Sequence, residues 1–160
     1  MPLLEDLYAQ QRARKIELAP FHYSANFLAS VIGSGITSTV NTNIQSDSHF
    51  VVRYINMTAT TAGEVVAVAT APLLVSFFDT GSGRTLFDVP QPVQNVCGGV
   101  AAAAGMGNLP FIMPEPWLVR AGGTVQTTVV NSGTTTFISV RFSLIGFKVF
   151  KFGGGGPAEI

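Results

Sequence analysis

Segments in which apolar and polar residues alternate make up most of the chain after residue 20. The alternation is clearest near the C-terminus, where a predicted strand at residues 134–144 has one apolar face formed by Ile138, Val140, Phe142 and Leu144. Successive side chains of a strand point to opposite faces of a sheet, so this pattern indicates an antiparallel strand with one buried face. The β pattern continues to residue 152 beyond Gly146, where we expect a β-bulge.

Shorter apolar or β-branched runs predict the remaining strands, and glycine-rich turns separate many of them. They lie at residues 36–44, 50–55, 64–70, 73–78, 85–89, 117–119 and 124–131. About eight short strands with turns at roughly 8 to 12 residue spacing are typical of an all-β sandwich or barrel. We therefore predict an antiparallel, jelly-roll-like β-sandwich over residues 21–152. Strand periodicity alone does not separate jelly-roll from immunoglobulin-like connectivity.

The first 20 residues have a different pattern, because they are rich in charges and carry a narrow apolar stripe. Residues 1–20 predict a short amphipathic helical arm that ends at Ala19-Pro20, with apolar positions at Leu3, Leu4, Leu7 and Tyr8. Such a short helix is rarely stable alone. The arm either docks on its own sandwich or becomes ordered on a neighbouring subunit. At the other end of the chain, the glycine-rich residues 153–160 predict a flexible tail.

Residues 90–116 combine many glycines and alanines with prolines at both ends, a composition unsuited to a strand interior. We interpret them as a long loop, and a loop of more than about 12 to 15 residues in a compact domain is usually functional. The alternative is a short alanine-rich helix at residues 100–104 that packs on the edge of the sandwich.

The chain is poor in charge, since only 11% of its 160 residues are Asp, Glu, Lys or Arg, whereas about 25% is usual. Residues 18–46, 89–114 and 121–140 contain none of these residue types. Large uncharged surfaces usually mark contacts between subunits. The alternative is a β-protein whose surface is simply covered by neutral Thr, Ser, Asn and Gln side chains.

The charges also limit the class of partner. Basic and acidic residues are equal in number, at 9 each, and no basic run is present. This balance disfavours direct binding of nucleic acid or of an anionic membrane surface. No apolar stretch reaches the about 20 residues of a transmembrane helix, and we expect no secretion signal. The one cysteine, Cys97, cannot form an internal disulfide, as expected for a protein made in a reducing compartment.

Candidate catalytic residues are scarce. Asp47, Ser48 and His49 are consecutive, and consecutive side chains of a strand alternate between its faces, so they cannot form a catalytic triad. The acidic residues that could act in glycoside hydrolysis each lie beside a glycine or proline turn: Asp79, Asp88 and Glu115.

Metal and cofactor motifs are also missing from the sequence. No paired ligand spacing such as CxxC or HxxxH surrounds His22, His49 or Cys97, and Cys97 has no base nearby in the sequence. The Gly-x-Gly pairs complete no phosphate-binding motif and are interpreted as turns. We predict no catalytic residue, no metal and no cofactor.

Several features of the chain are shared with a known group of proteins. They are the N-terminal helical arm, the Thr/Val/Asn-rich strands, the segment PEPWLVRAGG leading into TVQTTVVN, and the closing FSLIGFKVF. In these features residues 36–152 resemble the small jelly-roll cement or decoration proteins, minor capsid proteins of tailed bacteriophages.

The resemblance implies a non-enzymatic virion protein on the capsid surface, assembled in the host cytoplasm. It would act as a dimer or trimer that clamps neighbouring subunits of the major capsid protein. On this hypothesis the arm (residues 2–18) and the loop (residues 90–116) make the contacts. The candidate contact residues are Leu3, Leu4, Leu7, Tyr8, Met106, Phe111, Met113 and Trp117.

The alternative function is that of a head- or tail-fibre β-module that binds a host receptor or glycan. Trp117 suits either function, as an anchor on a partner protein or as a platform for a sugar. The aromatic residues are mainly Phe, at 12 against 1 Trp, which favours packing over sugar stacking. A third interpretation, a cytokine-like sandwich, is disfavoured because we expect neither a secretion signal nor a disulfide.

Overall fold

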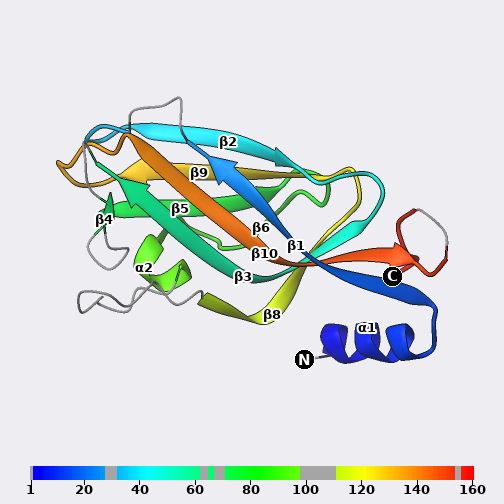
Figure 1. Cartoon of the computed structure of the whole chain (residues 1–160). Coiled ribbons are helices and arrows are strands. Elements are labelled where there is room, and N and C mark those ends of the chain that lie inside the picture. The colour runs from blue at the N-terminus through cyan, green and yellow to red at the C-terminus, as the bar shows by residue number, and fades with distance from the viewer. Residues whose placement is uncertain (1, 28–31, 62–64, 67–70, 98–110, 154–155) are drawn as a thin grey trace.

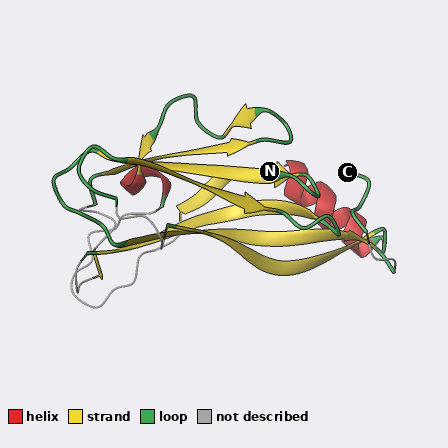
Figure 2. Ribbon diagram, turned by 90° about the horizontal axis from the view of Figure 1, so that it is seen from above, coloured by secondary structure: helices red, strands yellow, loops and turns green. Residues whose placement is uncertain are grey.

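Two β-sheets face each other in the computed structural model, which describes residues 2–27, 32–61, 65–66, 71–97, 111–153 and 156–160 (Figure 1, Figure 2). The first sheet has the order β1-β10-β3, and both β8 and β4 pair with β3. Its strands are β1 (Ile16–Asn26), β3 (His49–Thr60), β4 (Val65–Val66), β8 (Phe111–Val119) and β10 (Ser139–Lys151).

The second sheet has the order β2-β9-β5, and the short strands β6 and β7 pair with β5. Its strands are β2 (Thr37–Asn43), β5 (Leu73–Asp79), β6 (Arg84–Thr85), β7 (Gln91–Pro92) and β9 (Thr124–Asn131). The helices of the described chain are α1 (Pro2–Arg12) and α2 (Val93–Val96). Neither is long and apolar enough to cross a bilayer.

Each long strand lies in the sheet opposite to the long strand before it in the chain. The order β1, β2, β3, β5, β8, β9, β10 alternates between the first and the second sheet, and all the pairs are antiparallel. This alternation is the connectivity of a jelly roll. The predicted all-β, jelly-roll-like sandwich is therefore confirmed, and the structure supplies the connectivity that periodicity left open.

The main core fills the space between the two sheets, where β-branched and aromatic side chains from both inner faces meet. Phe142 of β10 contacts Phe27 and Phe77 edge to face, with ring centroids 6.2 and 5.7 Å apart. Val140, Phe142 and Leu144 are buried as predicted, but Ile138 is 45% exposed. The prediction for Ile138 is wrong because β10 begins at Ser139, later than the alternation suggested.

Most strand predictions in the middle of the chain are confirmed, since residues 37–43, 49–60, 73–79 and 124–131 form strands. The return strand predicted at residues 85–89 is shorter, because only Arg84–Thr85 pairs with β5. Residues 65–66 of the strand predicted at residues 64–70 form β4, and the other residues of that segment lie outside the described part of the chain.

The N-terminal helix is shorter than predicted. α1 ends at Arg12, and Arg14 adopts a left-handed φ of 54°, which turns the chain toward the sheet. β1 begins at Ile16 and pairs with β10 along its whole length. Pro20 does not end the helix but lies within β1, where it is tolerated because β1 is an edge strand. Residues 16–20 therefore belong to the sandwich and not to the arm.

Both ends of the predicted long loop at residues 90–116 contain regular structure. Residues 91–96 form β7 and α2, and β8 begins at Phe111. Cys97 and the apolar residues of α2 are buried in the main core. The alternative helix at residues 100–104 lies outside the described residues, as does Met106.

The C-terminal tail, predicted to be flexible over residues 153–160, folds back in its last described residues. Pro157 forms a β-bridge with Phe150, and Ala158 is only 4% exposed. Ala158 packs with α1 in a second apolar cluster, described below. The tertiary contact of Ala158 gives this segment a defined position that its glycine-rich composition did not predict.

Candidate interaction surfaces

The outer face of the second sheet carries no charged side chain on its long strands. The outward-pointing residues of β2, β9 and β5 include Thr39, Asn41, Asn43, Thr124, Gln126, Thr128, Leu74, Ser76 and Phe78. We refer to these residues as the neutral face. The three strands contain one charged residue, Asp79, which points inward and is 2% exposed.

Hydrogen bonds between neighbouring strands order the side chains of the neutral face. The hydroxyls of Thr39 and Thr128 are 3.0 Å apart, and the Thr124 hydroxyl donates to the Asn43 side-chain oxygen at 2.9 Å. At the border of this face, β2 pairs on one side only within the described residues. Natural proteins usually protect such an edge with charges or proline, and residues 37–43 contain neither. This edge and the neutral face thus form a surface on which no charged side chain opposes association with another chain.

The N-terminal helix docks on its own chain. Leu4 is 6% and Leu7 is 2% exposed, and they pack on the outer side of the first sheet with Ile16, Val51, Val149 and Ala158. Figure 1 shows α1 near the end of β10 and the C-terminus. The sequence predicts an arm that docks either on its own sandwich or on a neighbouring subunit. In the structure it docks on its own sandwich, so Leu4 and Leu7 are covered by their own sheet. Leu3 is half-buried and Tyr8 is 38% exposed.

Of the candidate contact residues outside the arm, the structure describes the side chains of Met113 and Trp117. Met113 is 6% exposed and belongs to the main core, so it does not line a surface. Trp117 is half-buried and packs against the same core. Met106 and the side chain of Phe111 lie outside the described part of the structure.

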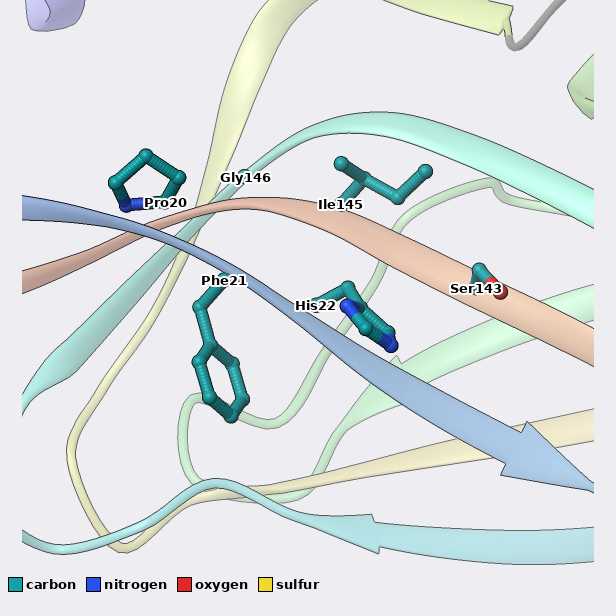
Figure 3. Close-up of a pocket in the computed structure, with 6 residues that line it drawn as sticks. All are labelled: Pro20, Phe21, His22, Ser143, Ile145 and Gly146. Carbon is teal, nitrogen blue, oxygen red and sulfur yellow. The ribbon is translucent and has the colours of Figure 1, made fainter.

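A shallow hollow of about 450 Å³ lies where β1 and β10 run side by side (Figure 3). Its lining includes Phe21, His22, Ser143 and Ile145, and Figure 3 shows Phe21 and Ile145 projecting to opposite sides of the strands. The hollow therefore follows the edge of the sheet and is open to solvent, not an enclosed cavity. His22 is exposed and makes no side-chain hydrogen bond within the described residues. Convergent polar groups, which ligand sites usually have, are missing from this lining.

A larger cleft, of about 530 Å³, lies between the turn that joins β5 to β6 and the end of β8. Its lining includes Asp79, Ser82, Arg84, Trp117 and Arg120. The sequence carries no local signal that joins the two arginines, because the residues of this cleft come from segments far apart in the chain.

A buried lysine, which the sequence did not single out, fixes another turn. Lys148 of β10 is 6% exposed, and its ammonium group donates to the Gln45 side-chain oxygen and lies 3.4 Å from the Asp47 carboxylate. The ammonium group also lies 4.5 Å from the centroid of the Phe21 ring. These contacts tie the turn between β2 and β3 to β10, and their role is structural.

The consecutive residues Asp47, Ser48 and His49 do not form a triad, as expected. The Ser48 hydroxyl donates to Asp47 at 2.9 Å, while His49 Nδ1 accepts from the backbone N–H of Ala121 at 3.1 Å. His49 Nε2 lies 2.8 Å from the carbonyl oxygen of Ala158 and donates to it. Both ring nitrogens of His49 are thus engaged by backbone groups, and the imidazole is not placed to activate Ser48.

Other reactive groups are equally constrained. Burial raises the pKa of the Cys97 thiol far above its usual range, which keeps it protonated and unreactive. Within the described residues, no three His, Cys, Asp or Glu side chains are close enough together to hold a metal ion. Charged side chains line the cleft beside Trp117, and Lys15, Lys151 and Glu159 line a smaller hollow of about 200 Å³.

No protein-family model matches the chain, and no curated protein shows significant similarity to it. One solved structure, a chain in the capsid asymmetric unit of cyanophage Pam1, is similar over 84% of this chain and 86% of its own length. The sequence identity is 18% and the TM-score is 0.40.

Proposed function

We propose that this chain is a non-enzymatic structural protein of a virus particle. It binds the surface of the capsid and reinforces contacts between neighbouring subunits of the major capsid protein, as cement or decoration proteins do. The observation that carries this proposal is the neutral face, a sheet surface without a charge on a jelly roll. Jelly rolls occur in viral capsid proteins as well as in lectins and cupins, so the surface, more than the fold, supports the choice.

The neutral face has the composition of a surface that becomes covered. The centres of protein interfaces are depleted in charge, because a charge that loses water there costs several kcal/mol unless it is paired. The ordered hydroxyl and amide groups of Thr39, Asn43 and Thr128 offer hydrogen bonds to a partner without this cost. Within the described residues β2 pairs with β9 alone, so its other edge offers backbone groups for pairing with a partner strand.

The docked helix changes how the contact is made. Leu4 and Leu7 are covered by their own sheet, so the proposed contact with the capsid uses the neutral face of the second sheet. The more accessible arm residues, Leu3 and Tyr8, lie on the side of the first sheet. Self-association as a dimer or trimer is part of the proposal, because several weak contacts made at once give durable attachment.

The experiment compares two glutamate variants in co-sedimentation with shells assembled from the major capsid protein that is encoded with this chain. Thr39→Glu places a charge on the neutral face. Thr58→Glu is the matched control, since Thr58 is an exposed strand threonine on the first sheet, opposite Arg141. We expect the unchanged chain and Thr58→Glu to bind shells equally, and Thr39→Glu to bind at least about tenfold more weakly.

Two results would overturn the proposal. The first is an unchanged chain that remains in the supernatant at every shell concentration. The second is a Thr39→Glu variant that binds as tightly as the unchanged chain. Light scattering of the same samples gives the mass in solution, and melting curves show whether both variants are folded.

A further inference from the structure

The cleft beside Trp117 has rigid walls. The Asp79 carboxylate is buried and holds the turn between β5 and β6, because it accepts hydrogen bonds from the Gly81 backbone N–H at 2.9 Å and from the Ser82 hydroxyl at 2.7 Å. The backbone N–H of Thr80 also donates to the Thr124 carbonyl oxygen at 2.9 Å. This bond joins the turn to the start of β9, so the cleft needs little ordering when a ligand binds.

Two arginine side chains without an ion-pair partner among the described residues line this cleft. Arg84 and Arg120 are exposed, and neither guanidinium group takes part in a hydrogen bond or ion pair among the described residues. The buried carboxylate of Asp79 also belongs to the lining and accepts its hydrogen bonds from neutral groups of its own turn, so the charged lining residues leave one excess positive charge. The chain has only 9 basic residues, and the placement of two of them at one cleft favours an anionic ligand. Guanidinium groups bind carboxylates through paired, charge-assisted hydrogen bonds.

The indole of Trp117 forms an apolar wall of the same cleft. Trp117 packs against the main core from β8, which holds the ring in place, and its N–H makes no hydrogen bond within the described part of the chain. Aromatic rings pack well against the C–H face of a sugar ring, and Trp combines a large apolar area with one polar donor. A volume of about 530 Å³ lies within the usual range for small-ligand sites.

We propose that this cleft, which is separate from the neutral face, binds a saccharide that carries a carboxylate. The carboxylate is held by Arg84 and Arg120, and the apolar side of the sugar ring lies on Trp117. The Ser82 hydroxyl, whose hydrogen is directed to Asp79, accepts a hydrogen bond from a sugar hydroxyl. This inference does not depend on capsid binding, and either proposal can fail alone.

The test uses the fluorescence of Trp117, which is the one tryptophan of the chain and therefore reports on this cleft. The probes are glucuronate, galacturonate and N-acetylneuraminate. Glucose is the neutral control, inorganic phosphate tests for a general anion site, and N-acetylglutamate tests for recognition of a protein carboxylate. Arg120→Gln removes a proposed ligand contact, and Arg141→Gln is the matched control because Arg141 is an exposed arginine of β10.

We expect a saturable change with at least one sugar acid, at an affinity at least about tenfold above that for glucose, phosphate and N-acetylglutamate. Arg120→Gln should weaken this binding by about tenfold or more, and Arg141→Gln should leave it unchanged. The proposal is overturned if no sugar acid gives a saturable change, or if glucose, phosphate or N-acetylglutamate binds as tightly. It is also overturned if Arg120→Gln binds like the unchanged chain.

Discussion

Replacement of Gly146 by alanine tests the bulge that links β10 to β3. The register between the two strands shifts between Ile145 and Gly146. A Cβ atom on Gly146 would lie 1.8 Å from the Val51 carbonyl oxygen, 2.8 Å from the Val51 carbonyl carbon and 3.1 Å from Val52 Cα. These are all backbone atoms of the paired strand, so no side-chain rotation relieves the overlap. The two strands must separate locally.

Separation of the two strands breaks backbone hydrogen bonds and core contacts, and these losses set its free-energy cost. Each backbone hydrogen bond that is lost next to the bulge removes about 0.5–1.5 kcal/mol, and two or three bonds are affected together with the core packing behind them. We therefore expect Gly146→Ala to lower the free energy of unfolding by about 3–5 kcal/mol, at the upper end for single substitutions. For a chain of this length this corresponds to a melting temperature about 10–15 °C lower.

Urea unfolding and calorimetry of Gly146→Ala and Gly33→Ala measure this difference. Gly33→Ala is the matched control, because its added Cβ would meet Ile36 Cγ1 at 3.6 Å, an ordinary contact. We expect the control to change the stability by less than about 0.5 kcal/mol. If Gly146→Ala stays within about 1 kcal/mol of the unchanged chain, the reasoning about the bulge is wrong.

Three further predictions concern the helix, the tail and the thiol. Leu7→Ala should destabilise the docked helix by about 2–3 kcal/mol, seen as faster hydrogen exchange in α1, whereas exposed Tyr8→Ala should have little effect. His49→Ala removes the hydrogen bonds to Ala121 and Ala158, and should cost about 1–3 kcal/mol and make the C-terminus more sensitive to carboxypeptidase; an unchanged digestion rate would contradict this role. Because burial raises its pKa, Cys97 should stay unlabelled by thiol reagents from pH 6 to about 9, where an ordinary thiol becomes reactive, and should label fully in denaturant.

The two proposed surfaces lie on different parts of the jelly roll. The neutral face lies on β2, β9 and β5, whereas the cleft lies where the turn after β5 meets the end of β8. A chain held to a shell by the neutral face can therefore keep the Trp117 cleft open to a second ligand. If the two surfaces act independently, Arg120→Gln should bind shells as tightly as the unchanged chain does. Thr39→Glu should likewise bind sugar acids as tightly as the unchanged chain.

The sequence by itself determined the local elements of this protein. Alternation located most of β10, shorter apolar or β-branched runs located β3, β5 and β9, the low charge indicated an uncharged surface, and Gly146 marked the bulge. These features are local, because side-chain direction in a strand repeats every second residue and a glycine without a Cβ permits a close backbone approach. For the same reason, it could be expected from their spacing that the His49 imidazole is not placed to activate Ser48.

Only the tertiary structure decided which segments meet. The sequence predicts that Pro20 ends a helix, but in the structure the segment around Pro20 pairs with β10 and forms an edge strand. The neutral face exists because Thr39 and Thr128 are paired across two strands, and the cleft exists because Arg84 and Arg120 come from separate turns. Likewise, Leu7 is buried because β1 and β10 offer it an apolar surface. Such contacts join residues far apart in the chain, and their free energy depends on a packing that no local pattern contains.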